Sequence, residues 1–211
     1  MRKQILIFGA STEWGSWDIE AGGWPERLKL FLFQREHGSV SREYDFHNLS
    51  ICGNKSSDVL RRFKFEAGQR ANSKYFDTTV IIFAVGTNDA VYSKNNKGCR
   101  TKLADFEKNL GKLISEAKKY SQHIFYKGLM RVDEKLTTPV DWNDDAFIYN
   151  EYLEKYNNAI MKVCADKKVG YIDMGGLMKK GDLYDGLHPN AKGHEKIYRK
   201  IKAQLLRDNL I

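Results

Sequence analysis

An aspartate and a histidine near the C-terminal end of the chain are spaced closely enough to act together. The stretch LYDGLHPNAKGHEKI, residues 183–197, places Asp185 three residues before His188. A carboxylate bonded to an imidazole fixes its tautomer and stabilises the imidazolium, which suits a general base. The same residues also suit an ordinary turn, because Asp-Gly is a common turn pair and Pro189 fits the first position of a helix. Other segments must decide between these interpretations.

Three more segments end in residues that could complete such a site. FGASTEWG carries Ser11 between small residues, where its hydroxyl could be a nucleophile or simply cap a helix. ICGNKSSD carries Gly53, whose N–H could face a developing negative charge or belong to a plain turn. AVGTNDA carries Asn88 and Asp89, and the Asn88 amide is either an oxyanion donor or a cap.

The elements around these segments predict a parallel sheet that would bring them together. Short apolar runs predict strands and amphipathic patterns predict helices, in alternation, which is typical of a three-layer α/β/α sandwich of the flavodoxin-like kind with a five-stranded parallel sheet. Ligands of such sheets sit at the carboxyl ends of the strands. The predicted strands are 4–8, 43–51, 79–86, 123–129 and 169–174, the predicted helices are 24–33, 57–70, 102–120, 147–167 and 189–206, and the long loops are 91–102 and 131–147.

The blocks FGAS, the Gly53 loop, GTND and DGLH resemble, in order and spacing, those of the SGNH hydrolases, also called the GDSL esterase and lipase family. The resemblance spans residues 5–201. It implies Ser11 as nucleophile, His188 as base and Asp185 as the third member of the triad. It also implies an oxyanion hole made by the Ser11 N–H, the Gly53 N–H and the Asn88 amide.

One position departs from the family pattern, which reads Gly-Asp-Ser where this chain has Gly9, Ala10 and Ser11. In the family that aspartate is chiefly a local structural and hydrogen-bonding group, so its loss should change the Ser11 turn rather than abolish the chemistry. The expected enzyme is a carboxylic ester hydrolase. Its expected substrate is a small-molecule ester, short-chain or acetyl, possibly on a carbohydrate. A lysophospholipase or thioesterase of the same family, and a non-catalytic flavodoxin-like module that binds an anionic small molecule, are the alternatives.

Composition sets the remaining expectations. The 211 residues with 42% hydrophobic content suit one domain, 1–211. The net charge of +8 is dispersed, so no nucleic-acid partner is expected. Three widely spaced cysteines and the lack of a transmembrane stretch favour a soluble cytoplasmic protein. Neither a cofactor nor a metal is expected, and the oligomeric state is open.

Several further residues receive weaker predictions. Five aromatic residues lie near the predicted site in sequence and are equally suited to lining a pocket or anchoring loops. His194, in the last predicted helix, is expected on the surface, and nothing marks Cys52 as a nucleophile. The aromatic residues are Trp14, Trp17, Tyr92, Trp142 and Tyr184.

Overall fold

The centre of the molecule is the parallel sheet that the apolar runs predict. The computed structural model describes residues 1–38, 43–71 and 74–211. Five parallel strands lie in the order β2-β1-β3-β6-β8. The predicted fold class is confirmed, and β3 lies at the centre of the sheet. The strands are β1 (Lys3–Gly9), β2 (Tyr44–Asn48), β3 (Thr78–Ala84), β6 (His123–Lys127) and β8 (Gly170–Ile172).

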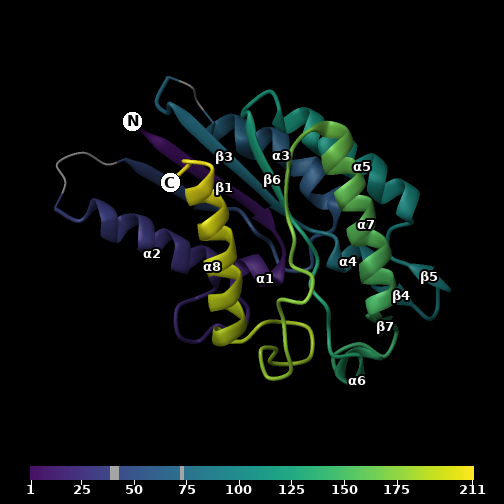
Figure 1. Ribbon diagram of the computed structural model, residues 1–211. Coiled ribbons are helices and arrows are strands. Elements are labelled where there is room, and N and C mark those ends of the chain that lie inside the picture. The colour runs from purple at the N-terminus through teal and green to yellow at the C-terminus, as the bar shows by residue number, and fades with distance from the viewer. Residues whose placement is uncertain (39–42, 72–73) are drawn as a thin grey trace.

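Helices cover both faces of the sheet because both faces of its central strands are apolar (Figure 1). In β1, Ile5 and Ile7 pack on one side with residues of α2 (Trp24–Glu36) and α8 (Ala191–Arg207). Leu6 and Phe8 point to the other side and pack with residues of three other helices. These helices are α3 (Ser56–Arg70), α5 (Leu103–Ala117) and α7 (Asn150–Lys167). The sheet is therefore packed between two hydrophobic cores.

The two segments predicted as long loops contain secondary structure of their own. Segments β4 (Tyr92–Ser93), β5 (Gly98–Cys99) and β7 (Ala146–Phe147) form a small antiparallel sheet in the order β5-β4-β7. The second segment also contains α6 (Glu134–Thr137). Two-residue strands carry too little periodicity to be read from sequence, so the prediction of plain loops is wrong here.

Two helices begin two or three residues later than predicted, and each has a local reason. Helix α7 begins at Asn150 and not at Phe147, because Phe147 pairs with Tyr92 in the small sheet. The last helix begins at Ala191 and not at Pro189, because the Asn190 side chain caps it by accepting the Gly193 N–H at 3.1 Å. The prediction of Pro189 as the first helical residue is therefore wrong.

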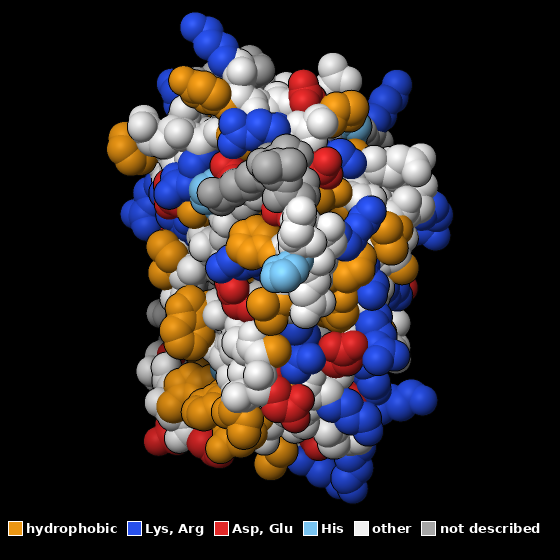
Figure 2. All heavy atoms as spheres, turned by 90° about the vertical axis from the view of Figure 1, so that its left-hand side faces the viewer, with side chains coloured by type: hydrophobic (Ala, Val, Ile, Leu, Met, Phe, Trp, Pro, Cys, Tyr) orange, Lys and Arg blue, Asp and Glu red, His pale blue; other side chains and the backbone are white. Residues whose placement is uncertain are grey.

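The surface carries its positive charge in a dispersed manner on the face shown in Figure 2. Lys and Arg side chains are spread over this face, with acidic and hydrophobic side chains between them. Many of the basic residues have acidic partners, such as Arg27 with Asp18 at 2.8 Å and Arg62 with Glu66 at 2.8 Å. In the described part of the chain no helix is long and apolar enough to span a bilayer.

Candidate active site

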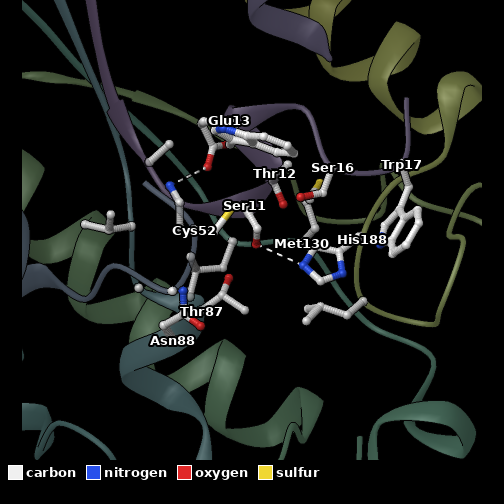
Figure 3. A pocket seen from close by; sticks show the side chains of 18 of the residues that line it. Ser11, Thr12, Glu13, Ser16, Trp17, Cys52, Thr87, Asn88, Met130 and His188 are labelled. Atoms are coloured by element: carbon white, nitrogen blue, oxygen red, sulfur yellow. Dashed lines mark hydrogen bonds between the residues drawn. The ribbon is translucent and has the colours of Figure 1, made fainter. Parts of the chain in front are cut away.

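The carboxyl ends of the parallel strands bring the four predicted segments to one cavity. Ser11 opens the short helix α1 (Ser11–Trp14) directly after β1, and Asn88 lies in α4 (Thr87–Ala90) directly after β3. Gly53 lies between β2 and α3, and His188 lies in the loop before α8. All four residues line one cavity of about 480 Å³. Figure 3 shows the Ser11 hydroxyl pointing to the His188 ring, with Asn88 nearby on its own helix.

Ser11, His188 and Asp185 form a continuous chain of hydrogen-bonding distances. Ser11 Oγ lies 2.9 Å from His188 Nε2, and His188 Nδ1 lies 2.7 Å from Asp185 Oδ2. The His188 and Asp185 side chains are largely buried, with 12% and 15% of their surfaces exposed. If Nδ1 donates to the carboxylate, Nε2 is free to accept the serine proton. This arrangement is the one that general-base activation of a hydroxyl requires.

The Asp185 carboxylate is held in its ionised form. Burial would raise the pKa of Asp185, but hydrogen bonds from the His188 ring and from the His188 and Leu187 N–H groups outweigh it and lower that pKa. The two backbone bonds, at 2.7 and 3.0 Å, both end on Oδ1. The carboxylate is therefore charged at neutral pH, as stabilisation of an imidazolium needs.

Gly53 and Asn88 line the same cavity, and each has an N–H group that could donate a hydrogen bond to a ligand. Gly53 has φ of +78°, a backbone conformation that glycine adopts at little cost, and nothing lies within 4 Å of where a Cβ would be. The Asn88 amide donates one N–H to the Asn54 carbonyl at 3.2 Å. This bond ties the Asn88 side chain to the Gly53 loop, and the second N–H of the amide remains available to a ligand.

Asp89 connects α4, which carries Asn88, to the start of α3, which follows the Gly53 loop. The sequence alone does not indicate this hydrogen-bonded connection. The Asp89 side chain is fully buried and accepts the Ser56 N–H at 2.9 Å and the Ser56 hydroxyl at 2.6 Å. Burial raises the pKa of Asp89 despite these hydrogen bonds. The side chain thus fixes the start of α3 relative to α4, and with it the two predicted oxyanion donors.

Aromatic side chains surround the mouth of the cavity. Trp14, Trp17 and Trp142 line it, and each is about half exposed, at 61%, 46% and 58%. Tyr184 stacks on Trp17 with 4.4 Å between ring centroids, and the Trp142 ring lies 5.9 Å from that of His188. Of the five aromatic residues, Tyr92 and Tyr184 do not line this cavity: the Tyr92 ring stacks on Tyr152, and Tyr184 reaches the site only through Trp17.

His194 is buried, so the prediction that it lies on the surface is wrong. Its side chain has no exposed surface. Both ring nitrogens have hydrogen-bond partners: Nδ1 accepts the Trp24 N–H at 3.1 Å, and Nε2 donates to the Ser16 carbonyl at 3.0 Å. Burial lowers the pKa of His194, which keeps the ring neutral. It therefore fixes the segment after α1 against α2. One polar residue within an amphipathic helix gives no sequence signal for such a role.

Three other residues that could carry chemistry line this cavity, and none of them is among the site residues predicted from the sequence. Cys52 is exposed at the cavity beside Gly53. Glu13 and Lys127 also line the cavity and are buried. The sequence around Glu13 does not mark it as a site residue, whereas a lysine inside the apolar run HIFYKGL is a sequence signal for a buried, functional Lys127. Across the described residues, no group of three or more His, Cys, Asp or Glu side chains could hold a metal ion.

Comparison with known proteins identifies the family. The model of the GDSL-like lipase/acylhydrolase family matches residues 7–196, which is most of the chain. The chain belongs to this family. It is accordingly a carboxylic ester hydrolase of the GDSL, or SGNH, class. No curated protein sequence matches the chain significantly.

Solved structures of esterases share the fold at low sequence identity. A lipase/acylhydrolase from Enterococcus faecalis is 22% identical with a TM-score of 0.70, over 99% of this chain and 97% of that one. A member of the lipolytic G-D-S-L family from Veillonella parvula is 16% identical with a TM-score of 0.71, over 97% and 99%. A catalytic mutant of an acetylxylan esterase from Geobacillus stearothermophilus is 14% identical with a TM-score of 0.69, over 96% and 93%.

Proposed function

We propose that the protein hydrolyses short-chain acyl esters, acetyl esters first, with Ser11 as nucleophile, His188 as general base and Asp185 as the group that orients His188. The observation that carries this proposal is the chain of distances from Ser11 Oγ to His188 Nε2, 2.9 Å, and from His188 Nδ1 to Asp185 Oδ2, 2.7 Å. A hydroxyl, an imidazole and an ionised carboxylate in this order are what acyl transfer through a serine requires.

The reaction proceeds in two halves at these atoms. Ser11 Oγ attacks the ester carbonyl carbon while its proton passes to His188 Nε2, and the carbonyl oxygen becomes an oxyanion. The Ser11 N–H, the Gly53 N–H and the free Asn88 N–H hold that oxyanion. The C–O bond to the alcohol breaks, and the alcohol leaves with the proton from His188. Water then attacks the acyl carbon while its proton passes to His188 Nε2. The bond between the acyl carbon and Ser11 Oγ breaks, and the imidazolium returns the proton to Oγ, so the acid leaves and the serine hydroxyl is restored.

The cavity favours a small acyl group attached to a polar, ring-containing alcohol. Its volume of about 480 Å³ is in the range of small-molecule sites. Three tryptophans line its mouth, and Trp17 has φ of +67°, which costs a non-glycine residue roughly 1–2 kcal/mol. A strained residue that presents a large ring at a site is a functional signal. Exposed aromatic faces suit the apolar faces of sugar rings, so an acetylated carbohydrate is the proposed substrate.

A covalent serine probe tests the reaction type. A fluorophosphonate should label the wild-type protein, and Ser11→Ala should abolish both labelling and hydrolysis of p-nitrophenyl acetate while the far-UV circular dichroism spectrum is unchanged. His188→Ala should do the same. Cys52→Ser is the matched control, because Cys52 carries an exposed thiol at the same cavity and its loss should leave labelling intact. Undiminished hydrolysis by folded Ser11→Ala would remove Ser11 from the reaction.

A second experiment tests the substrate class. Acetate release from acetylated oligosaccharides should exceed release of a long-chain acid from the corresponding p-nitrophenyl ester. Trp142→Ala should raise KM for the saccharide with little effect on p-nitrophenyl acetate. Phe65→Ala, which removes an exposed aromatic ring that does not line the cavity, is the control. A clear preference for the long-chain ester would instead favour a lipase or thioesterase.

A further inference from the structure

A buried ion pair lies beside the nucleophile, and no step of the proposed reaction uses it. Glu13, in α1, and Lys127, the last residue of β6, are 2% and 4% exposed. Glu13 Oε1 lies 3.4 Å from Lys127 Nζ. Both residues line the cavity that contains Ser11. Burial of two opposite charges is costly unless their geometry and remaining hydrogen bonds compensate, so this pair needs an explanation.

The Glu13 carboxylate holds the backbone that leads into Ser11. Its Oε2 accepts the Ala10 N–H at 3.3 Å, and its Oε1 accepts the Trp24 indole N–H at 3.3 Å. The Glu13 carbonyl also accepts the Asn48 side-chain N–H at 2.7 Å. Ala10 is the residue at which the chain leaves β1 and enters α1. The carboxylate therefore anchors the peptide immediately before the nucleophile to the neighbouring elements.

Gly9 makes room for this carboxylate. A Cβ on Gly9 would lie 2.4 Å from Glu13 Cγ and 2.8 Å from Glu13 Oε2, distances that real atoms do not adopt. The lack of a side chain at Gly9 thus allows the Glu13 side chain to fold back against the end of β1. In the view of Figure 3, Glu13 and His188 are seen on different sides of Ser11.

We propose that Glu13 and Lys127 are positioning residues for the esterase reaction: Glu13 fixes the turn that directs the Ser11 hydroxyl and N–H, and Lys127 neutralises the buried carboxylate beside the oxyanion hole. This inference rests on the proposed function of Ser11. The family pattern has an aspartate at the position of Ala10. In this chain the Glu13 carboxylate, three residues later, then takes the place of that aspartate. Without Lys127, a negative charge beside the reacting carbonyl would oppose the developing oxyanion.

Single and paired neutralisation tests the proposal. Glu13→Ala should lower kcat for p-nitrophenyl acetate by about tenfold or more, with KM within twofold, because the Ala10 N–H loses its acceptor. Lys127→Met should do the same, because it leaves the Glu13 charge unpaired beside the oxyanion. The rate constant for fluorophosphonate labelling of Ser11 should fall by the same factor. The double variant Glu13→Gln/Lys127→Met should have a kcat above that of either single variant, since the introduced amide oxygen can still accept the Ala10 N–H and no unpaired negative charge remains beside the oxyanion.

Rates are compared per mole of folded protein, because loss of a buried charge also destabilises a fold. Glu66→Gln is the control, since it removes one partner of the Arg62 ion pair on α3 and should lower only the thermal midpoint. Full kcat and labelling rates in folded Glu13→Ala and Lys127→Met, or a double variant no faster than the single variants, would overturn the proposal while Ser11 stays the nucleophile. A wild-type protein without esterase activity or labelling would overturn the proposed function and this inference together.

A second variant keeps the test decisive if the single variants do not fold. Gly9→Ala retains both charges but forces the Glu13 side chain away from the end of β1. It should lower kcat and the labelling rate without a matching change in KM. Wild-type values for folded Gly9→Ala would show that the Ser11 turn does not depend on the carboxylate.

Discussion

Asp185 holds His188 at two atoms: Oδ2 lies 2.7 Å from the ring Nδ1, and Oδ1 accepts the His188 backbone N–H at 2.7 Å. The spacing of three residues makes this possible, because one turn brings the carboxylate to both the backbone and the ring of the same residue. Orientation of the imidazole is thus set within a single loop. No second segment has to move for the pair to form.

We expect Asp185→Asn to reduce kcat by about 10⁴-fold while the fold is retained. The amide oxygen would keep accepting the backbone N–H groups, and the amide N–H would then donate to His188 Nδ1. The proton of the ring would move to Nε2, which could no longer accept the proton of Ser11. Initial rates with p-nitrophenyl acetate and a thermal melt would check this. The exposed Asp144→Asn serves as control, and a kcat within tenfold of wild type would contradict the role of Asp185.

Asn88→Ala should lower kcat by roughly 10²-fold, which is the usual cost of one oxyanion donor. The expected loss is in kcat more than in KM, because the donor meets full negative charge only in the transition state. Its hydrogen bond to the Asn54 carbonyl, at 3.2 Å, makes a small local contribution to stability. Steady-state kinetics of Asn88→Ala beside the exposed Asn96→Ala would measure the effect. A full-rate variant would remove Asn88 from the oxyanion hole.

Asp89→Ala should destabilise the protein by about 1–3 kcal/mol, because it leaves the buried Ser56 N–H and hydroxyl without their acceptor. The start of α3 would then be free to shift relative to α4, so kcat should fall as well. Urea unfolding gives the free energy, and exposed Asp166→Ala on α7 is the matched control. An unfolding midpoint equal to that of the control would mean that this connection contributes nothing.

Features that depend on a local sequence pattern could be predicted, namely the strands and the segments at their ends. Roles that depend on contacts between distant segments could not. The strands could be predicted because neighbouring residues such as Leu6 and Ile7 point to opposite faces of the sheet and both faces are buried, which gives continuous apolar runs. The segments carrying Ser11 and His188 were visible because parallel strands end at one edge. His194 and Glu13 were not, because their partners Ser16, Trp24 and Lys127 become neighbours only after folding.

The buried ring of His194 should make the stability of the protein depend on pH. Burial lowers its pKa in the folded state, so between that value and the unfolded pKa of about 6.5 the unfolded chain binds the extra proton. This contribution to stability is complete above pH of about 6.5 and decreases as the pH falls below it, by at most about 1.4 kcal/mol per pH unit. Urea unfolding at several pH values from neutral to mildly acidic would measure that slope.

In His194→Gln the free energy of unfolding should depend less steeply on pH, because the titrating ring is gone. The variant should also be less stable at neutral pH, because the hydrogen bonds to Trp24 and Ser16 are disturbed. His123→Gln is the matched control: His123 is exposed at the start of β6, and its replacement should leave the wild-type slope unchanged. The comparison is between slopes rather than absolute stabilities, so a less stable variant still gives an answer. If His194→Gln kept the full wild-type slope, the acid sensitivity would arise elsewhere in the fold.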